Sequence, residues 1–493
     1  MLKATSAIAG AKLVTILISI LRTKILAELL GPAGMGLVNL VLSSVELARV
    51  FFAFGLDCAT VRKVAAASTD DDPALLDEAY RIAARTALFI GVAACAALAI
   101  ASPFLSTKFL GTPDHFWWFL LAAGSLVFTP LLGVELAFLQ GLKRSWDLAV
   151  CQIIASIFGA LLTVAMVAAL GKIGAIAALS PVAVGSLLIH HHFLKRYRPK
   201  IETPRQFNQL VESRKLLKLG SGFAINGIWL VASGWLNLVF IQSYYGHDQG
   251  VLQAGLYGAA TTLANFYVGI LISSMATEFF PSLIHAANDR PVMNRLLNQQ
   301  TLLAICIGVP VSLVLLISSP WIMSILYTRE FSAGSGLMRW LLAGMAIRFA
   351  ACPLGYTLLA MGSPRLIALS ELAMGAVMIG TSYVMLQLFG LNGLGMALVL
   401  TNSLYLAGIL GVMKRFGVGW QANTAFFVAE TFAVIGCCLA ASLLMPSFHG
   451  MLVCAGITAC YLVHLAVLIR RKSGIGFAQF IAKFRKLTQR KHV

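Results

Sequence analysis

Charge is scarce in this sequence, and negative charge is the scarcer kind. Asp, Glu, Lys and Arg make up 11% of its 493 residues, with 19 acids against 37 Lys and Arg. Soluble domains carry about a quarter charged residues, so this composition excludes an ordinary water-soluble globular protein. The net charge of +18 does not indicate a nucleic-acid-binding protein, because the sequence has no soluble basic domain to carry it.

Organised cysteine pairs, metal motifs and long loops are also missing. The nine cysteines lie in or beside apolar stretches without a paired extracellular pattern, so we expect no disulfide framework. No paired-acid metal motif or nucleotide-binding loop is evident, and the longest outer loop, 319–336, has 18 residues. Enzymes that polymerise or transfer glycans usually present a sizeable site outside the membrane. We therefore predict that the chain is not an enzyme and has no metal or cofactor.

Apolar residues, in contrast, make up 59% of the sequence and gather into fourteen long stretches. Each stretch is long enough to cross a bilayer core of about 30 Å as a helix of about 20 residues. Because backbone amides in lipid must be satisfied within the element, we predict an all-α polytopic membrane protein with about 14 transmembrane helices. The predicted spans are residues 8–30, 36–56, 83–106, 116–139, 148–169, 173–194, 218–244, 252–276, 300–318, 337–359, 366–389, 393–412, 424–445 and 451–469.

The basic residues of the loops indicate the orientation. With the N-terminus inside, the inner segments and tails carry 28 of the 37 Lys and Arg, and the outer loops carry four. One missed or false span would destroy this asymmetry, so the positive-inside rule supports an even number of spans and two cytoplasmic termini. The first stretch contains Lys12, Arg22 and Lys24 and lacks a convincing cleavage site, so we interpret it as a retained helix.

Short similarities recur at a nearly constant offset and indicate an internal repeat. The pairs are 36–38 with 255–257, 102–106 with 319–324, and 139–144 with 360–365, at offsets of 219, 217 and 221. This offset covers six spans, an even number, so the sequence predicts two parallel six-helix lobes about an axis along the membrane normal. The predicted segments are an N-terminal lobe at 1–195, a cytoplasmic amphipathic linker at 196–217, a C-terminal lobe at 218–415, two extra transmembrane helices at 416–470 and a basic amphipathic cytoplasmic tail at 471–493.

Charges inside the predicted spans are the strongest indication of function. The basic ones are Lys12, Arg22, Lys24, Arg49 and Arg348. A central charge costs about 2.5–3.5 kcal/mol to insert, so such residues usually face a cavity or a partner. Lys24 and Arg49 each have an acid three or four residues away, which allows a local pair. Arg22 and Arg348 have none, so they are the strongest candidates to bind an anion, for which Arg offers bidentate hydrogen bonds.

The seventh and eighth spans add neutral polar side chains, of which Asn226 and Asn265 are candidates for substrate contacts. The alternative is helix packing, where Asn commonly bonds across spans. Glu46 and Glu278 are candidates for coupling transport to H⁺ or Na⁺. Glu46 can instead pair with Arg49, and Glu278 can instead snorkel to the interface.

Other polar residues have milder interpretations. Glu135 lies close to an inner loop and is expected at the interface. The three histidines at 190–192 occupy the inner end of the sixth span, and consecutive helical positions spread around the axis, so they make a poor metal site and are also expected at the interface. Trp229 and Trp235 offer flat faces to sugar rings.

Seven short segments carry a resemblance to a known family: Ala4-Thr5-Ser6, Lys24-Ile25-Leu26-Ala27, Gly31-Pro32-Ala33-Gly34-Met35-Gly36-Leu37, Phe279-Phe280-Pro281-Ser282-Leu283, Phe331-Ser332-Ala333, Gly355-Tyr356 and Ala368-Leu369-Ser370-Glu371. They resemble bacterial polysaccharide-type flippases, the lipid-linked oligosaccharide translocases of the multidrug/oligosaccharidyl-lipid/polysaccharide exporter superfamily. The resemblance covers roughly residues 4–415. The last two predicted spans and the basic tail depart from the family pattern, so their role stays open.

This resemblance implies two six-helix lobes around a cationic cavity. It also implies alternating-access movement of an undecaprenyl-diphosphate-linked oligosaccharide, such as an O-antigen or exopolysaccharide repeat unit, from the inner to the outer leaflet of the bacterial inner membrane. The candidate substrate contacts are Arg22, Lys24, Arg49, Arg348, Asn226 and Asn265, with Glu46 and Glu278 as coupling candidates. The expected partners are the lipid-linked oligosaccharide, membrane lipids and glycan polymerase machinery, and no nucleic acid.

Three alternatives stay open. A multidrug or cation antiporter of the same superfamily would share the fold, but organic cations favour an acid-dominated cavity, whereas basic residues lead in the first lobe. A flippase for lipid-linked peptidoglycan precursors is poorly separated from the lead hypothesis, because the sequence does not reveal the sugars. A membrane-embedded glycan polymerase or glycosyltransferase has the least support.

Overall fold

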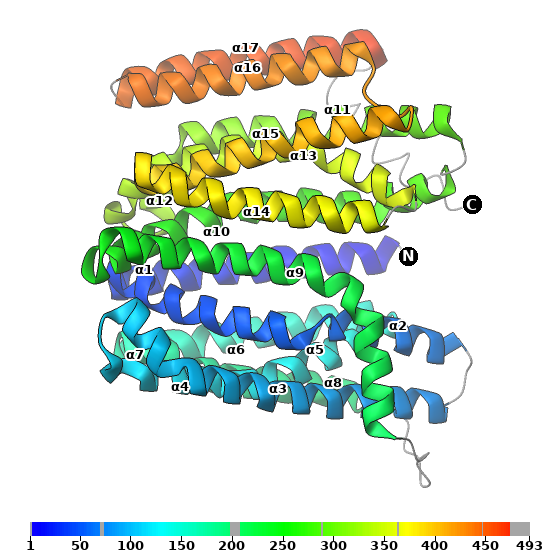
Figure 1. The fold of residues 1–493 in the computed structure, drawn as a ribbon, viewed down its shortest axis with the longest axis vertical. Coiled ribbons are helices and arrows are strands. Elements are labelled where there is room, and N and C mark those ends of the chain that lie inside the picture. The colour runs from blue at the N-terminus through cyan, green and yellow to red at the C-terminus, as the bar shows by residue number, and fades with distance from the viewer. Residues whose placement is uncertain are drawn as a thin grey trace. The chain divides into compact units, whose positions relative to one another are not determined.

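The computed structural model describes residues 2–69, 73–197, 208–286, 289–361, 364–445 and 447–473 (Figure 1). Within these ranges, the described side chains exclude residues 2–13, 69, 221–226, 267–268, 270–278, 281, 364–368, 447–448 and 468–473. The described residues form α-helices, two short 3₁₀ helices and their connections, without a β-strand. The predicted all-α fold class is therefore confirmed.

The helices fall into two compact units. The first consists of Met1–Ala259, Met323–Phe331 and Glu371–Gln387, and the second of Ala260–Ile322, Ser332–Ser370 and Leu388–Val493. In chain order the first ten elements are α1 (Leu2–Ala53), α2 (Leu56–Thr69), α3 (Pro73–Leu110), η1 (Pro113–His115), α4 (Phe116–Ala123), α5 (Ser125–Gly141), α6 (Ser145–Leu170), α7 (Lys172–Ala177), α8 (Leu179–Leu194) and α9 (Gln209–Tyr245). The others are α10 (His247–His285), α11 (Arg290–Ile317), α12 (Ser319–Leu326), η2 (Arg329–Gly334), α13 (Ser335–Ala360), α14 (Pro364–Phe389), α15 (Leu391–Arg415), α16 (Ala422–Leu444) and α17 (Ser447–Ser473).

Eleven helical segments among the described residues are long and apolar enough to cross a membrane. One of them, Val14–Ala53 in α1, covers most of both the first and the second predicted span, because only the backbone of Gly31 leaves the helical conformation there (φ 63°, ψ −178°). The spans predicted at 218–244 and 252–276 lie in α9 and α10, parts of whose side chains are outside the described set. Each predicted apolar stretch thus falls on helix, and the chain is a multi-span membrane protein.

The breaks between helices recur at the offset of the predicted repeat. Gly31 and Gly246 share a positive φ and an extended ψ (63°, −178° and 75°, −178°), 215 residues apart. Gly171 and Gly390, 219 residues apart, share φ and ψ of 60°, −139° and 59°, −146°. Only glycine adopts these backbone angles without strain. Equivalent positions therefore turn the chain in the same way, which supports the repeat; the lobe boundaries stay a prediction.

A close crossing of α1 with the first turns of α10, inside the first unit, supports the repeat independently. A methyl group on Gly36 would lie 1.8 Å from the carbonyl oxygen of Val251, and one on Gly255 would lie 2.0 Å from that of Pro32. Val251 and Gly255 follow Pro32 and Gly36 by the same 219 residues. The contact of Gly36 with Val251 and the contact of Gly255 with Pro32 are therefore equivalent under the repeat. A two-fold axis through the crossing requires such a pair of contacts.

The predicted linker is shorter than expected. α9 begins at Gln209 and continues without a break into the seventh predicted span. The side chain of Asn208 accepts hydrogen bonds from the backbone N–H groups of Leu210 and Val211, so it forms the N-cap. The last part of the predicted linker therefore belongs to α9. Residues 198–207 of the predicted linker and most of the basic tail lie outside the described residues.

The two extra C-terminal helices are anchored inside the second unit by polar side chains. Arg339 on α13 donates from Nη1 to the carbonyl oxygen of Ser442 at 2.7 Å, where the last turn of α16 exposes unpaired carbonyls. Asn298 on α11 is buried; it donates to the carbonyl oxygen of Gly419 at 3.1 Å and accepts from the N–H of Gln421 at 2.8 Å. The appendix is therefore a fixed part of this unit.

Replacing Asn298 by alanine is expected to loosen that anchor. The change removes both hydrogen bonds to the segment before α16 and leaves a cavity where the buried amide was, at a cost of about 1–3 kcal/mol. Thermal unfolding of the purified protein measures the loss. The exposed Asn423 on α16 provides the matched control, Asn423→Ala, which should unfold like the wild type. Equal unfolding of both variants would show that the anchor contributes no stability.

Candidate substrate-binding site

Arg22 is the predicted site residue whose surroundings best fit a bound anion. It lies in α1, in the half that precedes Gly31, and its side chain is partly buried. Its Nε atom is buried and has no hydrogen-bond partner among the described residues. A buried guanidinium nitrogen without a partner is costly, since desolvation is not offset by a hydrogen bond. A phosphate oxygen would supply the acceptor that Arg22 lacks.

Lys24, two residues later, is already engaged. Its ammonium lies 3.2 Å from a carboxylate oxygen of Glu28, as the spacing predicted, and it also donates to the backbone carbonyl of Tyr327. The contact to Tyr327 comes from a segment 303 residues away in the chain. Lys24 can meet a ligand only by exchanging one of these partners.

Arg49 and Glu46, in the second half of α1, form the local pair that their spacing allowed. Arg49 donates from Nε and Nη2 to the two carboxylate oxygens of Glu46, at 2.8 and 2.6 Å. This bidentate geometry satisfies both charges. At the start of α2, burial raises the pKa of the Asp57 carboxyl, against a smaller lowering by the Arg49 cation. Because Arg49 and Glu46 already bind each other, Arg49 is a weaker candidate for binding an anion, and Glu46 a weaker candidate for ion coupling, than the sequence indicated.

The structure gives less detail about the surroundings of the remaining predicted site residues. Arg348 on α13 is partly buried and Asn265 on α10 is exposed; both belong to the second unit. The side chains of Asn226 and Glu278 lie outside the described residues, so their roles stay predictions. Among the predicted site residues whose side chains the structure describes, the hydrogen bonds above join Glu46 and Arg49.

The two tryptophans differ in their surroundings. Trp235 donates from Nε1 to the hydroxyl of Ser44 at 3.1 Å and packs edge-on against Phe109, so it is a packing residue. Trp229 lies directly against Gly375, where any added methyl group would overlap its ring. Its Nε1 is buried and has no partner among the described residues, so Trp229 is the better candidate for a substrate contact.

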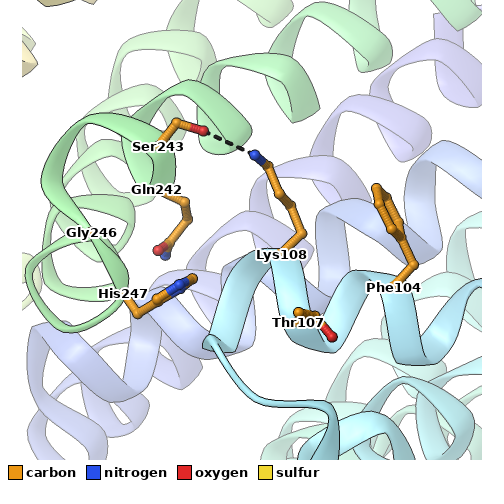
Figure 2. A pocket seen from close by; sticks show the side chains of 7 residues that line it. All are labelled: Phe104, Thr107, Lys108, Gln242, Ser243, Gly246 and His247. Atoms are coloured by element: carbon orange, nitrogen blue, oxygen red, sulfur yellow. Dashed lines mark hydrogen bonds between the residues drawn. The ribbon is translucent and has the colours of Figure 1, made fainter.

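Figure 2 shows a cavity in the first unit that sequence reasoning missed. It has a volume of about 470 Å³ and is lined by Phe104, Thr107, Lys108, Gln242, Ser243, Gly246 and His247. Lys108 donates to the hydroxyl of Ser243 at 3.2 Å across it. These residues come from the ends of α3 and α9 and the start of α10, and none belongs to the predicted site. In the sequence, Lys108 was recognisable only as a basic residue of an outer loop and Gly246 only as a possible turn, so nothing indicated that they line one cavity.

Glu135 and His190, both expected at the membrane interface, are buried against neighbouring helices. Glu135 on α5 is 3% exposed and lies 2.8 Å from Nδ1 of His191 on α8. His190 is 2% exposed, and its Nδ1 lies 2.7 Å from the carbonyl oxygen of Ser186. The side chain of His191 is 35% exposed, and that of His192 is exposed. The ends of α5 and α8 pack against each other, and this contact between helices buries Glu135 and His190 although both lie close to loops in the sequence.

Comparisons with known proteins match most of the chain. The model of a family described as polysaccharide biosynthesis protein matches residues 1–287. A lipid II flippase MurJ in an inward closed conformation shares the fold with a TM-score of 0.71 and 14% identity, covering 94% of this chain and 99% of that one. An inward-facing multidrug resistance MATE family transporter shares it at 0.63 and 13%, covering 86% and 95%.

A further solved structure comes from Pyrococcus furiosus. It is a transporter of the MOP superfamily described as having a binding pocket of reverse polarity, with a TM-score of 0.59 and 14% identity, covering 88% of this chain and 96% of that one. No protein in the curated set matches this sequence. The solved structures show that the fold is one found in flippases and multidrug transporters.

Proposed function

Because this chain belongs to the polysaccharide biosynthesis protein family, we propose that it is a flippase for an undecaprenyl-diphosphate-linked oligosaccharide. It moves this lipid from the inner to the outer leaflet of the bacterial inner membrane, for assembly of an O-antigen or an exopolysaccharide. The family match includes all of α1 and α9 and therefore the residues around Arg22. The MurJ fold supports a lipid-linked substrate, since MurJ is described as a lipid II flippase.

The observation that carries this proposal is the buried, unpartnered guanidinium nitrogen of Arg22. A diphosphate offers several anionic oxygens, and arginine binds such oxygens through two parallel hydrogen bonds. Lys24 joins the site by exchanging its bond to Glu28. Trp229 stacks on the first sugar, because an indole has both an apolar face and a donor at its edge.

Alternating access requires a pivot between the two lobes, and the crossing of α1 with α10 fits this role. The glycines let the two backbones approach closely, so the lobes rock about a small contact. Both termini are cytoplasmic in this proposal, and the glycan polymerase machinery receives the lipid on the outer side. Glu46 is already held by Arg49, so of the two acids that the sequence indicated, Glu278 is the one that stays a candidate for H⁺ or Na⁺ coupling.

Lipid binding by the purified protein tests the substrate class. Undecaprenyl diphosphate is expected to bind at least several-fold more tightly than undecaprenyl monophosphate, because the second phosphate adds charge-assisted hydrogen bonds to Arg22. Native mass spectrometry with both lipids in one sample measures the ratio. Arg22→Ala should reduce this preference, and an equal affinity of the wild type for both lipids would contradict the proposal.

The second candidate function is a multidrug antiporter, favoured by the likeness to MATE transporters. It predicts that overexpression raises resistance to organic cations and that these cations compete with the lipid. The cation at Arg22 opposes this function, because like charge repels such substrates. Resistance to several cationic drugs without any effect on lipid movement would favour the antiporter.

A further inference from the structure

Glu135 is an acid inside the first unit that the proposed substrate site does not use. It lies on α5, which packs against α3 and α8 (Figure 1). Its oxygen Oε1 lies 2.8 Å from Nδ1 of His191 on α8, and the hydroxyl of Tyr80 on α3 hydrogen-bonds to the same carboxyl group. Its other oxygen, Oε2, is buried and has no hydrogen-bond partner among the described residues. Three helices therefore close around a carboxyl group that is only half satisfied.

A carboxylate in this position is poorly stabilised. Burial removes water from both oxygens, and the imidazole and the phenol compensate for only part of that loss. Ionisable groups inside membrane proteins usually mark a pathway for ions or protons for this reason. Binding of a proton to the carboxyl group converts the carboxylate into a neutral acid and removes the unbalanced charge.

His191 connects the buried acid with its surroundings. Its side chain is 35% exposed, whereas that of Glu135 is 4% exposed. It lies in the last turn of α8, directly before the turn at 195–197. One ring nitrogen faces Glu135, and the exposed part of the ring lets the side chain exchange a proton with water and pass it on, as imidazole does near neutral pH.

Other titratable groups lie on the helices that pack around α5 and α8, and several have their own partners. They are Asp77 paired with Arg81 at 2.8 Å on α3, Cys151 bonded to the carbonyl of Leu148 on α6, His190 bonded to the carbonyl of Ser186 on α8, and Lys63 on α2 paired with Glu212 on α9 at 3.3 Å. Tyr80 packs edge-on against Phe138, next to the acid on α5. Glu135 contacts His191 on α8 and Tyr80 on α3, so a change of its charge alters the hydrogen bonds that join α3, α5 and α8.

We infer that Glu135 and His191 form a proton-binding site, in which the carboxyl group of Glu135 takes the proton at Oε1, the oxygen that faces Nδ1 of His191, and His191 is the relay. The proton comes from water and returns to it, and no other group is transferred. Resting on the proposed function, the site couples a proton to transport through the packing of the three helices. It is separate from Glu46 and Glu278, the acids that the sequence indicated.

Infrared difference spectroscopy of the purified protein in lipid tests the site without any substrate. A pH titration from about 5 to about 9 covers the range of shifted buried carboxyl and imidazole groups. The carbonyl stretch of a protonated carboxyl group is expected to appear in the wild type as the pH falls and to be missing in Glu135→Gln. In His191→Asn, this band should titrate at a different pH, because the carboxyl group has lost its partner.

The matched controls are Glu330→Gln and His192→Asn, which change an exposed acid and an exposed histidine. Both should keep the band and its midpoint, and size-exclusion chromatography should show every variant to be folded. A wild type without a titrating carboxyl band, or a band that persists in Glu135→Gln, overturns the inference. Because the measurement needs no lipid substrate, its outcome is independent of whether the chain is a flippase. If flipping is observed, its dependence on a pH gradient should be lost in Glu135→Gln.

Discussion

Arg22→Ala is expected to lower the rate of lipid-diphosphate transfer across the membrane by about 10- to 100-fold. The estimate follows from the loss of a charged hydrogen bond of about 1.5–3 kcal/mol, at about 1.4 kcal/mol for each factor of ten. Arg22→Lys should retain part of the rate, because lysine keeps the charge but not the bidentate geometry. Initial rates in proteoliposomes with equal amounts of inserted protein measure both effects.

The control for this prediction is an arginine outside the proposed site. Arg62 on α2 is exposed, so Arg62→Ala should transport like the wild type. A structural role of Arg22 would lower the thermal stability of Arg22→Ala together with its rate. Unchanged transfer in a correctly inserted Arg22→Ala would remove this residue from the account.

Gly36→Ala and Gly255→Ala are expected to have the second large effect. Each added methyl group would lie within 2.0 Å of a carbonyl oxygen of the opposite helix, so α1 and α10 must move apart. Overpacking of this kind costs about 1–3 kcal/mol. The crossing is also closed by Asn39, which donates to the carbonyl of Ala254 at 3.2 Å, and separation of the helices would break this bond. Thermal unfolding should therefore occur at a lower temperature, and lipid transfer should slow.

Gly234→Ala provides the control for the glycine crossing. Gly234 lies within α9, and an added methyl group there meets no atom within 4 Å. Alanine favours helix by about 1 kcal/mol over glycine, so this variant should be at least as stable as the wild type. Because the two crossing variants open the same contact, the double variant should lose less than the sum of the single losses. Full additivity would indicate that the two contacts do not form one crossing.

The sequence predicted the features that depend on local pattern. Long apolar stretches predicted the helices, and spacings of three and four residues predicted the pairs Glu46–Arg49 and Lys24–Glu28, which the structure confirms. It also revealed the repeat whose equivalent glycines meet at the crossing. These predictions succeed because helical geometry fixes which near neighbours in sequence face each other.

Contacts between distant segments were beyond sequence reasoning. Glu135 and His191 are 56 residues apart, and Arg339 and Ser442 are 103 apart. Their pairing depends on which helices pack together and how deeply, and hydropathy alone does not determine this. For the same reason, the sequence placed Glu135 close to a loop but did not show that it is buried and paired with His191.

The exposure of a labelled lipid-diphosphate oligosaccharide on each leaflet of proteoliposomes, with and without the protein, tests the central claim most directly. The account predicts protein-dependent transfer that slows in Arg22→Ala and persists in Arg62→Ala. The measurement should include several glycans and imposed proton and sodium gradients. Absence of transfer under all these conditions, with insertion verified, would contradict the flippase function.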